Sequence, residues 1–298
     1  MKNKLKSFCK KIHIEYVGIA PSGPYLDLKE RVQDRIEKGY ITGMEENDIR
    51  RRIDSKLTME DTASIVVCLF PYFVGYKEES NLSIYTHGKD YHIIIKEKLE
   101  QIGNYLSKEI EDFHYKAFTD TGALVDRHLA YLAGLGYFGL NQNIITDKYG
   151  SFVFIGYLLT NYPFEIDKPL NKTCIKCKKC IEKCPGGALL DDFQMDPRKC
   201  LSFITQKKDA LSLDEQNKMK DCNTVFGCDI CQRVCPHNKG VEYSNLEEFK
   251  KDLISSLEEE EIFNMSNKAF KRIYGDRAFS WRGRKIIARN LSYLKGEK

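Results

Sequence analysis

Long hydrophobic runs are missing from this sequence of 298 residues. A membrane-spanning helix needs about 20 consecutive apolar residues, and the best candidate, residues 64–70, has the length of a buried strand. The lysine-rich N-terminal segment also lacks the apolar stretch of a secretory signal peptide. We therefore expect a cytoplasmic protein that does not associate with membranes.

Disorder and a small disulfide scaffold are excluded by composition and length. The chain is 42% hydrophobic and contains 17 Tyr and 16 Phe, which is far more apolar material than a disordered chain carries. It is also long enough to bury a core without disulfide bonds. The length predicts one large domain or two modest ones.

Charge is nearly balanced except near the C-terminus. Residues 266–298 contain ten Lys and Arg against two acidic residues, whereas the rest of the chain has 37 basic and 41 acidic residues. A basic segment on a mildly acidic body indicates a polyanionic partner, and an ordinary solvated surface is the alternative.

The first 160 residues have the pattern of an α/β unit. Apolar residues recur three and four positions apart at 89–110 and 123–135, which predicts helices. Strands are predicted at the short β-rich runs 12–19, 64–70 and 152–160. Alternating strands and helices favour a partly parallel sheet that helices cover on both faces.

Nine of the eleven cysteines lie between Cys174 and Cys235, and Cys9 and Cys68 are isolated. Such clustering in a reducing compartment favours metal binding over disulfides. Residues 161–172 include two prolines and precede this region, so we expect a boundary between two modules there.

The cysteine spacing is typical of two [4Fe–4S] clusters. The run C-x2-C-x2-C-x3-C-P, found in bacterial ferredoxins, is formed by Cys174, Cys177, Cys180 and Cys184. The run C-x2-C-x3-C-P is formed by Cys228, Cys231 and Cys235. The ligand missing from this second run is Cys200 or Cys222.

A compact loop supplies only three thiolates to a cluster, so the fourth must come from a distant point of the chain. We therefore expect one cluster to be held by Cys174, Cys177, Cys180 and Cys235. The other is expected to be held by Cys184, Cys228, Cys231 and either Cys200 or Cys222. Zinc and disulfides are the alternatives, but zinc prefers paired C-x2-C knuckles. Two neighbouring clusters would conduct electrons to a further acceptor.

A dinucleotide-binding fingerprint is not indicated. Gly134, Gly136 and Gly139 match G-x-G-x-x-G, but a helical pattern precedes them where the fingerprint requires a strand. No acidic residue suited to a ribose follows about twenty residues later. We expect these glycines to end a helix and form a tight turn.

Several segments together resemble one family, the epoxyqueuosine reductases of tRNA modification. The resemblance covers roughly residues 10–290 and rests on DIRRR (48–52), HGKDYH (87–92), TDTGALVDR (119–127), GLGYFGLNQNIIT (134–146), YGSFVFIGYLLTN (149–161), CLSFITQ (200–206), GCDICQRVCPHN (227–238) and SWRGRKIIARN (280–290). This combination is more specific than the cysteines alone.

The resemblance implies an α/β (α+β) cobalamin-binding domain at residues 1–165. It implies a ferredoxin-like domain with two [4Fe–4S] clusters at 166–242 and a helical basic segment at 243–298. The implied activity is reduction of epoxyqueuosine to queuosine at the wobble position (34) of tRNA with a GUN anticodon, the last step of queuosine biosynthesis. A ferredoxin- or flavodoxin-like electron donor and a monomeric enzyme are also implied. Longer members of the family continue into a helical-repeat extension, and this chain resembles a short form.

Asp120 matches the proton donor of the family. Expelling the epoxide oxygen as water requires an acid, and burial near an apolar macrocycle would keep a carboxyl protonated. The alternative role for Asp120 is to cap the helix that follows it.

The resemblance also places Arg52, Asp120, Ile144, Ile155 and Ser202 at corrinoid contacts, some of them through backbone atoms. Cys200 matches a cluster ligand, so we expect Cys200 to be the missing ligand of the second cluster and Cys222 to be spare.

Two histidines are expected to have structural roles. His128 belongs to an incomplete D-x-H-x-x-G cobalamin signature with Tyr131 at the glycine position, and we expect it in the core. His87 precedes GKDYH, and we expect it at the surface, with a substrate-side contact or a position near cobalt as alternatives.

The basic C-terminal segment is expected to bind tRNA phosphates through Arg282, Arg284, Lys285 and Arg289. Trp281, the single tryptophan, either stacks on a base or packs in a core or interface. Two other functions compete with tRNA modification: a cobalamin-dependent reductase of a small molecule, such as an organohalide, and a plain dicluster electron carrier.

Overall fold

A four-stranded sheet forms the centre of the N-terminal half in the computed structural model, which describes residues 1–295. Its strand order is β1-β2-β6-β3. The bounds are Tyr16–Pro21 for β1, Ser64–Pro71 for β2, Tyr115–Phe118 for β3 and Val153–Thr160 for β6. β2 is buried along its whole length, as expected for a central strand covered on both faces.

The expectation of a partly parallel sheet is wrong, because each of the three strand pairings is antiparallel. Pro21, at the end of β1, pairs with Ser64, at the start of β2. The intervening chain forms two helices, α2 (Leu26–Glu37) and α3 (Ile49–Ile53), and returns to the end of the sheet where β1 finished. β2 and β3 do run in the same direction, but β6 lies between them.

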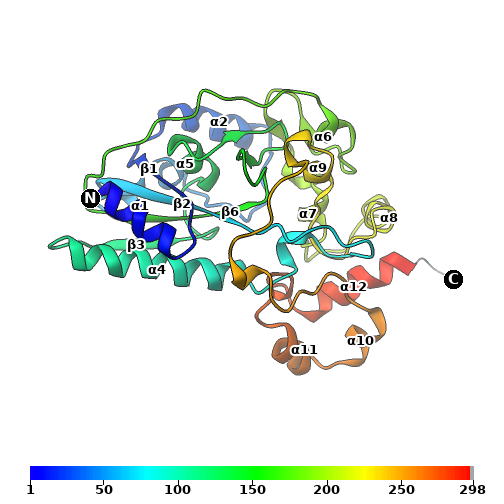
Figure 1. Cartoon of the computed structure of the whole chain (residues 1–298). Helices are drawn as coiled ribbons and strands as arrows, with labels where there is room; N and C mark the ends of the chain where they lie inside the picture. The colour runs from blue at the N-terminus through cyan, green and yellow to red at the C-terminus, as the bar shows by residue number, and fades with distance from the viewer. Residues whose placement is uncertain (296–298) are drawn as a thin grey trace.

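Helices cover both faces of the sheet, as predicted (Figure 1). Alternate residues of β2 point to opposite faces because the side-chain period of a strand is two. Val66 and Phe70 pack with α1 (Lys2–Lys11) and α4 (Tyr91–Glu109). Ile65 and Val67 pack with α2 and α5 (Asp126–Leu132).

The predicted strands at 64–70 and 152–160 are confirmed by β2 and β6, and the predicted helix at 89–110 is confirmed by α4. The first strand begins later than predicted, because α1 is followed by a turn in which His13 has a φ of 65°. α5 is shorter than predicted, because residues 119–125 form a loop.

The glycine motif has the structure expected from its helical context. Gly134 has a φ of 67° directly after the C-terminal residues of α5, and it ends that helix. A left-handed conformation at this position favours glycine because it has no Cβ. The following residues form a small hairpin of β4 (Tyr137–Phe138) and β5 (Ile144–Ile145).

The cysteine-rich segment is built mainly from short elements. Residues 173–238 contain a two-stranded hairpin, β7 (Leu189–Leu190) and β8 (Gln194–Met195), and four helices: α6 (Lys179–Glu182), α7 (Leu201–Ile204), α8 (Leu213–Asp221) and α9 (Ile230–Arg233). The C-terminal helices are α10 (Glu259–Asn264), α11 (Asn267–Tyr274) and α12 (Arg284–Lys295). Single 3-10 turns occur at Ser55–Leu57, Ile84–Thr86, Pro197–Lys199, Pro236–Asn238, Glu247–Phe249 and Ala278–Ser280.

A buried hydrogen-bond network joins the cysteine-rich segment to the sheet. The Gln232 side-chain amide donates to the Ser151 carbonyl oxygen at 2.9 Å and to the Tyr72 hydroxyl at 3.2 Å. The Asn238 side chain donates to the Ser151 hydroxyl at 2.9 Å and accepts the Ser151 backbone N–H at 2.7 Å. These contacts fix the distance between the two parts of the chain.

The C-terminal helices pack under the cysteine-rich segment (Figure 1). Leu82, Phe226, Phe270 and Ile287 contribute to one buried cluster there. Buried Arg277 donates to the Asp252 carbonyl oxygen at 2.8 Å, so this arginine of the basic segment has a structural role. Within the described part of the chain, each helix is too short or too polar to traverse a lipid bilayer.

Candidate active site

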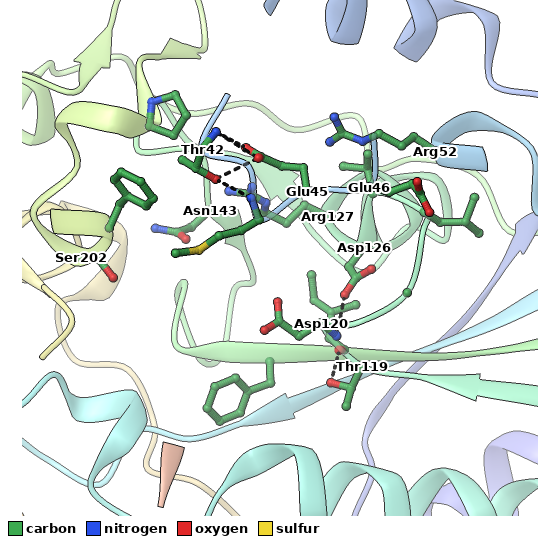
Figure 2. Close-up of a pocket in the computed structure, with 18 of the residues that line it drawn as sticks. Thr42, Glu45, Glu46, Arg52, Thr119, Asp120, Asp126, Arg127, Asn143 and Ser202 are labelled. Atoms are coloured by element: carbon green, nitrogen blue, oxygen red, sulfur yellow. Dashed lines mark hydrogen bonds between the residues drawn. The ribbon is translucent and has the colours of Figure 1, made fainter. Parts of the chain in front are cut away.

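A cavity of about 580 Å³ lies at one end of the sheet, between the N-terminal half and the cysteine-rich segment (Figure 2). Its apolar lining includes Leu124, Val153, Phe154 and Ile155, and its polar lining includes three arginines and Asp120. Figure 2 shows Asp120, on the loop after β3, and Ser202, on α7, at different sides of the open space. A cavity of this size with both apolar and polar lining suits a large amphipathic ligand.

A second cavity, of about 320 Å³, adjoins the first and reaches the cysteines. Val153, Cys200 and Ser202 line both cavities. Four cysteines line the second cavity, namely Cys184, Cys200, Cys228 and Cys231. A redox centre held by these thiols would therefore lie beside the larger cavity.

The remaining cysteines of the predicted ligand sets line a separate small cavity, whose lining includes Cys174, Cys177, Cys180 and Cys235. Cys177 is exposed, whereas Cys174, Cys180 and Cys235 are buried, so this group of thiols reaches the surface through Cys177. Cys222 lines neither of these two cysteine cavities. Among residues 1–295, no three His, Cys, Asp or Glu side chains converge closely enough for a single metal ion.

Asp120 lies in a loop whose backbone is held in a left-handed conformation, with a φ of 58°. Its N–H donates to the Asp126 carboxylate at 3.1 Å, and the adjacent Thr119 hydroxyl donates to the Ile155 carbonyl oxygen at 3.0 Å. The Asp120 side chain is 65% exposed, open to the cavity that it lines. Helix capping, the alternative role for Asp120, is wrong because α5 begins at Asp126 and its N-cap is Val125.

The expectation that burial keeps Asp120 protonated is also wrong. The hydrogen bond from His92 lowers the pKa of Asp120, and the Tyr91 hydroxyl, which donates to Oδ2 at 2.7 Å, lowers it further against the opposing effect of burial. Although burial lowers the pKa of His92, its contacts with Asp120 and Asp90 raise it to about 9. At neutral pH the proton of this pair therefore resides on His92.

The pKa of Asp126 is shifted in the opposite direction to that of Asp120. Burial raises the pKa of Asp126 to about 7, and the negative charge of Asp120 contributes to the rise. The pKa values of Asp120, on the loop, and of Asp126, at the start of α5, are thus shifted in opposite directions, because Asp120 faces cationic His92 whereas burial dominates at Asp126.

Three arginines give the cavity a positive region. Arg35, Arg52 and Arg127 all line it, and Arg127 donates to the Gln142 carbonyl oxygen at 2.7 Å. Burial lowers the pKa of Arg52 and of Arg127, and the charge of Arg35 lowers both further. A ligand with anionic or carbonyl groups would relieve this repulsion.

Most of the predicted corrinoid contacts come together in this cavity. Arg52, Asp120, Ile155 and Ser202 line it. The Ile144 side chain is instead buried in the hydrophobic cluster under α5, and its neighbour Asn143 lines the cavity. A contact through the Ile144 backbone stays a prediction.

Several residues that line or contact the site are not predicted from the sequence. Asp90, Tyr91 and His92 stand in HGKDYH, and Asp126 and Arg127 stand in TDTGALVDR, yet no role was assigned to them. Spacing alone gives no signal for these roles, since α4 and the loop after β3 meet only in the folded chain. Arg35 lies in α2, where the sequence resembles an ordinary amphipathic helix.

The two histidines and the tryptophan have definite environments. His128 is buried, as expected, and packs against Tyr25. The expectation that His87 lies at the surface is wrong: its side chain is buried, and Nε2 is 3.1 Å from the Leu82 carbonyl oxygen. Trp281 is 53% exposed and donates to Gln206, a residue that lines the large cavity.

A surface hollow of about 530 Å³ lies beside Trp281. Its lining includes Lys271, Arg282, Arg284 and Lys285, and the Arg282 guanidinium stacks 3.7 Å from the Trp281 ring centroid. Arg284 also donates to the Ile262 carbonyl oxygen. Arg289 lies outside the hollow and donates to the Asp209 carbonyl oxygen.

Two family profiles match the chain. Residues 52–121 match the profile described as epoxyqueuosine reductase QueG, DUF1730, and residues 173–238 match a 4Fe-4S double cluster binding domain. The epoxyqueuosine reductase of Bacillus cereus is 36% identical over 97% of this chain and 78% of its own length.

Solved structures resemble the whole chain. One is an epoxyqueuosine reductase with a tRNA-Tyr epoxyqueuosine-modified stem loop, with 34% identity, a TM-score of 0.92 and coverage of 98% of this chain and 80% of that one. Another is the Bacillus subtilis enzyme with its catalytic aspartate loop swung out of the active site, with 33% identity, a TM-score of 0.90 and the same coverage.

Proposed function

The chain belongs to the epoxyqueuosine reductase family, and we propose that its large cavity is where the epoxide of epoxyqueuosine in tRNA is reduced to give queuosine. One observation carries this proposal: the cavity that Asp120 lines shares Val153, Cys200 and Ser202 with the adjoining cavity, which is lined by Cys184, Cys200, Cys228 and Cys231. The arrangement brings a proton source and an electron source to neighbouring cavities that share one wall.

The cofactors of the family, cobalamin and two [4Fe–4S] clusters, fit the residues present. The apolar wall around Val153 and Ile155 suits a flat macrocycle, and Arg52 and Ser202 suit its polar side groups. Bound cobalamin supplies a strongly reducing cobalt ion, and the clusters supply its electrons. We propose Arg52, Asp120, Ile144, Ile155 and Ser202 as the residues that contact it.

We propose the crossed ligand assignment for the clusters. The surface cluster is held by Cys174, Cys177, Cys180 and Cys235, and the inner cluster by Cys184, Cys200, Cys228 and Cys231. The exposure of Cys177 supports electron delivery to the surface cluster by an external ferredoxin- or flavodoxin-like protein. Each set lines its own cavity, which is the grouping that the assignment requires.

The chain contributes the acid of the reaction. Reducing an epoxide to a carbon–carbon double bond uses two electrons and two protons, and it releases the oxygen as water. The Asp120 carboxyl is the ionisable group that we assign to proton delivery, because it projects into the cavity from a loop fixed by Asp126 and Thr119.

We propose that the tRNA anticodon stem-loop, with a GUN anticodon, lies over the surface beside α11 and α12. Lys271, Arg282 and Lys285 line the hollow there, and exposed Trp281 is linked through Gln206 to the rim of the active-site cavity. The lysine and arginine side chains would contact phosphates, and the indole would stack on a base.

We further propose that residues 1–165 bind cobalamin, residues 166–242 hold the clusters, and residues 243–298 contact tRNA. We also propose that the enzyme acts as a monomer. Its proposed substrate, tRNA, places it in the cytoplasm.

The proposed function is tested by anaerobic incubation of the fully loaded protein with epoxyqueuosine-containing tRNA. Digestion to nucleosides and mass spectrometry measure the conversion. We expect queuosine to form only when cobalamin, both clusters and a reductant are present. Turnover of small organohalides with no reaction on tRNA would overturn the proposal.

A further inference from the structure

Three side chains at the N-terminus of α4 connect the Asp120 carboxyl to the surface. His92 Nδ1 is 2.8 Å from Asp90 Oδ1, and His92 Nε2 is 3.5 Å from Asp120 Oδ2. Asp90 is the N-cap of α4, and the same oxygen accepts the His92 backbone N–H at 2.9 Å. The imidazole is therefore held between two carboxylates, with its Nε2 directed to Asp120.

The reaction needs more protons than one carboxyl holds. Departure of the epoxide oxygen as water requires two protons, whereas Asp120 carries at most one at a time. A second proton must reach Asp120 Oδ2 before the turnover ends. Asp120 opens to the cavity, so cofactor and substrate bound there would cover it, and a neighbouring group that keeps contact with solvent would then have to supply that proton.

We propose that His92, oriented by Asp90, is the positioning residue that supplies protons to Asp120. The proposal rests on the proposed function, in which Asp120 is the acid of the reaction.

The surroundings of His92 favour this direction of transfer. The groups that face the imidazole are Asp90 and Tyr91 on α4 and Asp120 on the loop after β3. The contacts with Asp120 and Asp90 overcome the effect of burial and raise the pKa of His92 to about 9, so it is cationic at neutral pH. Asp126 and Arg127, at the start of α5, also lie near Asp120: burial raises the pKa of Asp126 and lowers the pKa of Arg127.

Tyr91 is a poor alternative as the proton source. Its hydroxyl donates to the same oxygen of Asp120, but burial and the charge of Asp120 raise the pKa of Tyr91 above its ordinary value. A phenol made less acidic by its surroundings gives up a proton less readily than an imidazolium.

The proton passes from His92 to Asp120 and then to the substrate oxygen. The His92 Nε2–H bond breaks as an Asp120 Oδ2–H bond forms, and Asp120 then gives this proton to the substrate oxygen. His92 regains a proton from solvent, which its 36% exposed side chain contacts. Two such transfers, with two electrons from the clusters, convert the epoxide to a carbon–carbon double bond and water.

The electrostatic coupling between His92 and the carboxylates of Asp120 and Asp90 is measured by histidine-selective NMR titration of the protein with both clusters oxidised. The chain has six histidines, and His92→Gln assigns the signal. We expect His92 to titrate above pH 8 and its pKa to fall by about 1–3 units in Asp120→Asn and in Asp90→Asn. Titration near pH 6.5 without response to Asp120→Asn would overturn the proposal.

The contribution of His92 and Asp90 to proton supply is measured as the pH dependence of single-turnover conversion of epoxyqueuosine tRNA. We expect His92→Gln to retain cofactors and tRNA affinity but to react about 10- to 100-fold more slowly. His92→Ala should regain rate with added imidazole. The wild-type rate should fall as pH rises through about 9, and this fall should move to lower pH in Asp90→Asn.

His114→Gln is the matched control, because exposed His114 pairs with Asp61 away from the cavity. A wild-type rate and an unchanged pH profile in His92→Gln would contradict the proposed supply of protons. If the wild type does not convert epoxyqueuosine, the proposed function fails, and the NMR titration still decides whether His92 and Asp120 are coupled.

Discussion

At the scale of single residues, the protonation of Asp120 is set by its neighbours. The loop gives Asp120 a φ of 58°, a conformation that aspartate adopts more readily than most residues. This backbone directs its carboxyl to the cavity while His92 and Tyr91 contact Oδ2. The cost of the local conformation is consistent with a functional position.

Asp120→Asn should leave cobalamin and both clusters in place but reduce epoxide conversion at least about 100-fold, because an amide cannot deliver the proton. Single-turnover assays on epoxyqueuosine tRNA measure the effect. Asp61→Asn is the control, since Asp61 is an exposed carboxylate beside His114. Conversion by Asp120→Asn at the wild-type rate would rule out Asp120 as the proton donor.

Cys200 and Cys222 differ in position in a way that predicts opposite phenotypes. Cys200 lines the inner cysteine cavity with Cys184, whereas Cys222 lies outside it at the C-terminal end of α8. We expect Cys200→Ala to lose one of the two clusters and Cys222→Ala to retain both. Iron and sulfide analysis with EPR of the reduced protein distinguishes these outcomes, and the reverse result would exchange the assignments.

At the scale of elements, the residue pattern predicted single helices and strands but not their arrangement in the sheet. The periodicity of residues 89–110 predicted α4, and the apolar run at 64–70 predicted β2, because each buries its own repeating face. The order and direction of the strands were not predictable in this way. The connection through α2 and α3 returns the chain to the end of β1, so that β2 runs antiparallel to β1. The residue spacing within one helix does not indicate this direction.

The surface beside α11 and α12 has one aromatic anchor. Replacing Trp281 with Ala should weaken binding of an anticodon stem-loop by roughly 1–3 kcal/mol if a base stacks on it. Fluorescence anisotropy at two salt concentrations measures this, and the loss should be nearly independent of salt. Phe263→Ala is the control, because Phe263 on α10 is similarly exposed. Equal affinity of wild type and Trp281→Ala would remove Trp281 from the tRNA surface.

At the scale of the whole molecule, the site exists because separate parts of the chain are held together. Asp120 comes from the sheet half and Cys200 from the cysteine-rich segment, and the buried Gln232 and Asn238 amides connect these parts. The cysteine spacing predicted two clusters from sequence, since their ligands are close along the chain. The proton-supplying group of Asp90 and His92 was not predictable, because it meets Asp120 only through tertiary packing.

Gln232→Leu should lower the apparent melting temperature by roughly 2–10 °C, because it leaves the Ser151 carbonyl oxygen and the Tyr72 hydroxyl without the amide that donates to them. Anaerobic thermal unfolding of the cluster-loaded protein measures the change. Gln101→Leu provides the control, since Gln101 lies on the exposed face of α4. An unchanged melting temperature would mean that this network does not stabilise the junction.

The most direct test of the central claim is anaerobic reconstitution with iron, sulfide and cobalamin, followed by absorption and EPR spectroscopy. We expect one retained cob(II)alamin per chain alongside two [4Fe–4S] clusters. Two clusters without retained cobalamin would contradict the assignment of the large cavity and leave the chain as an electron carrier.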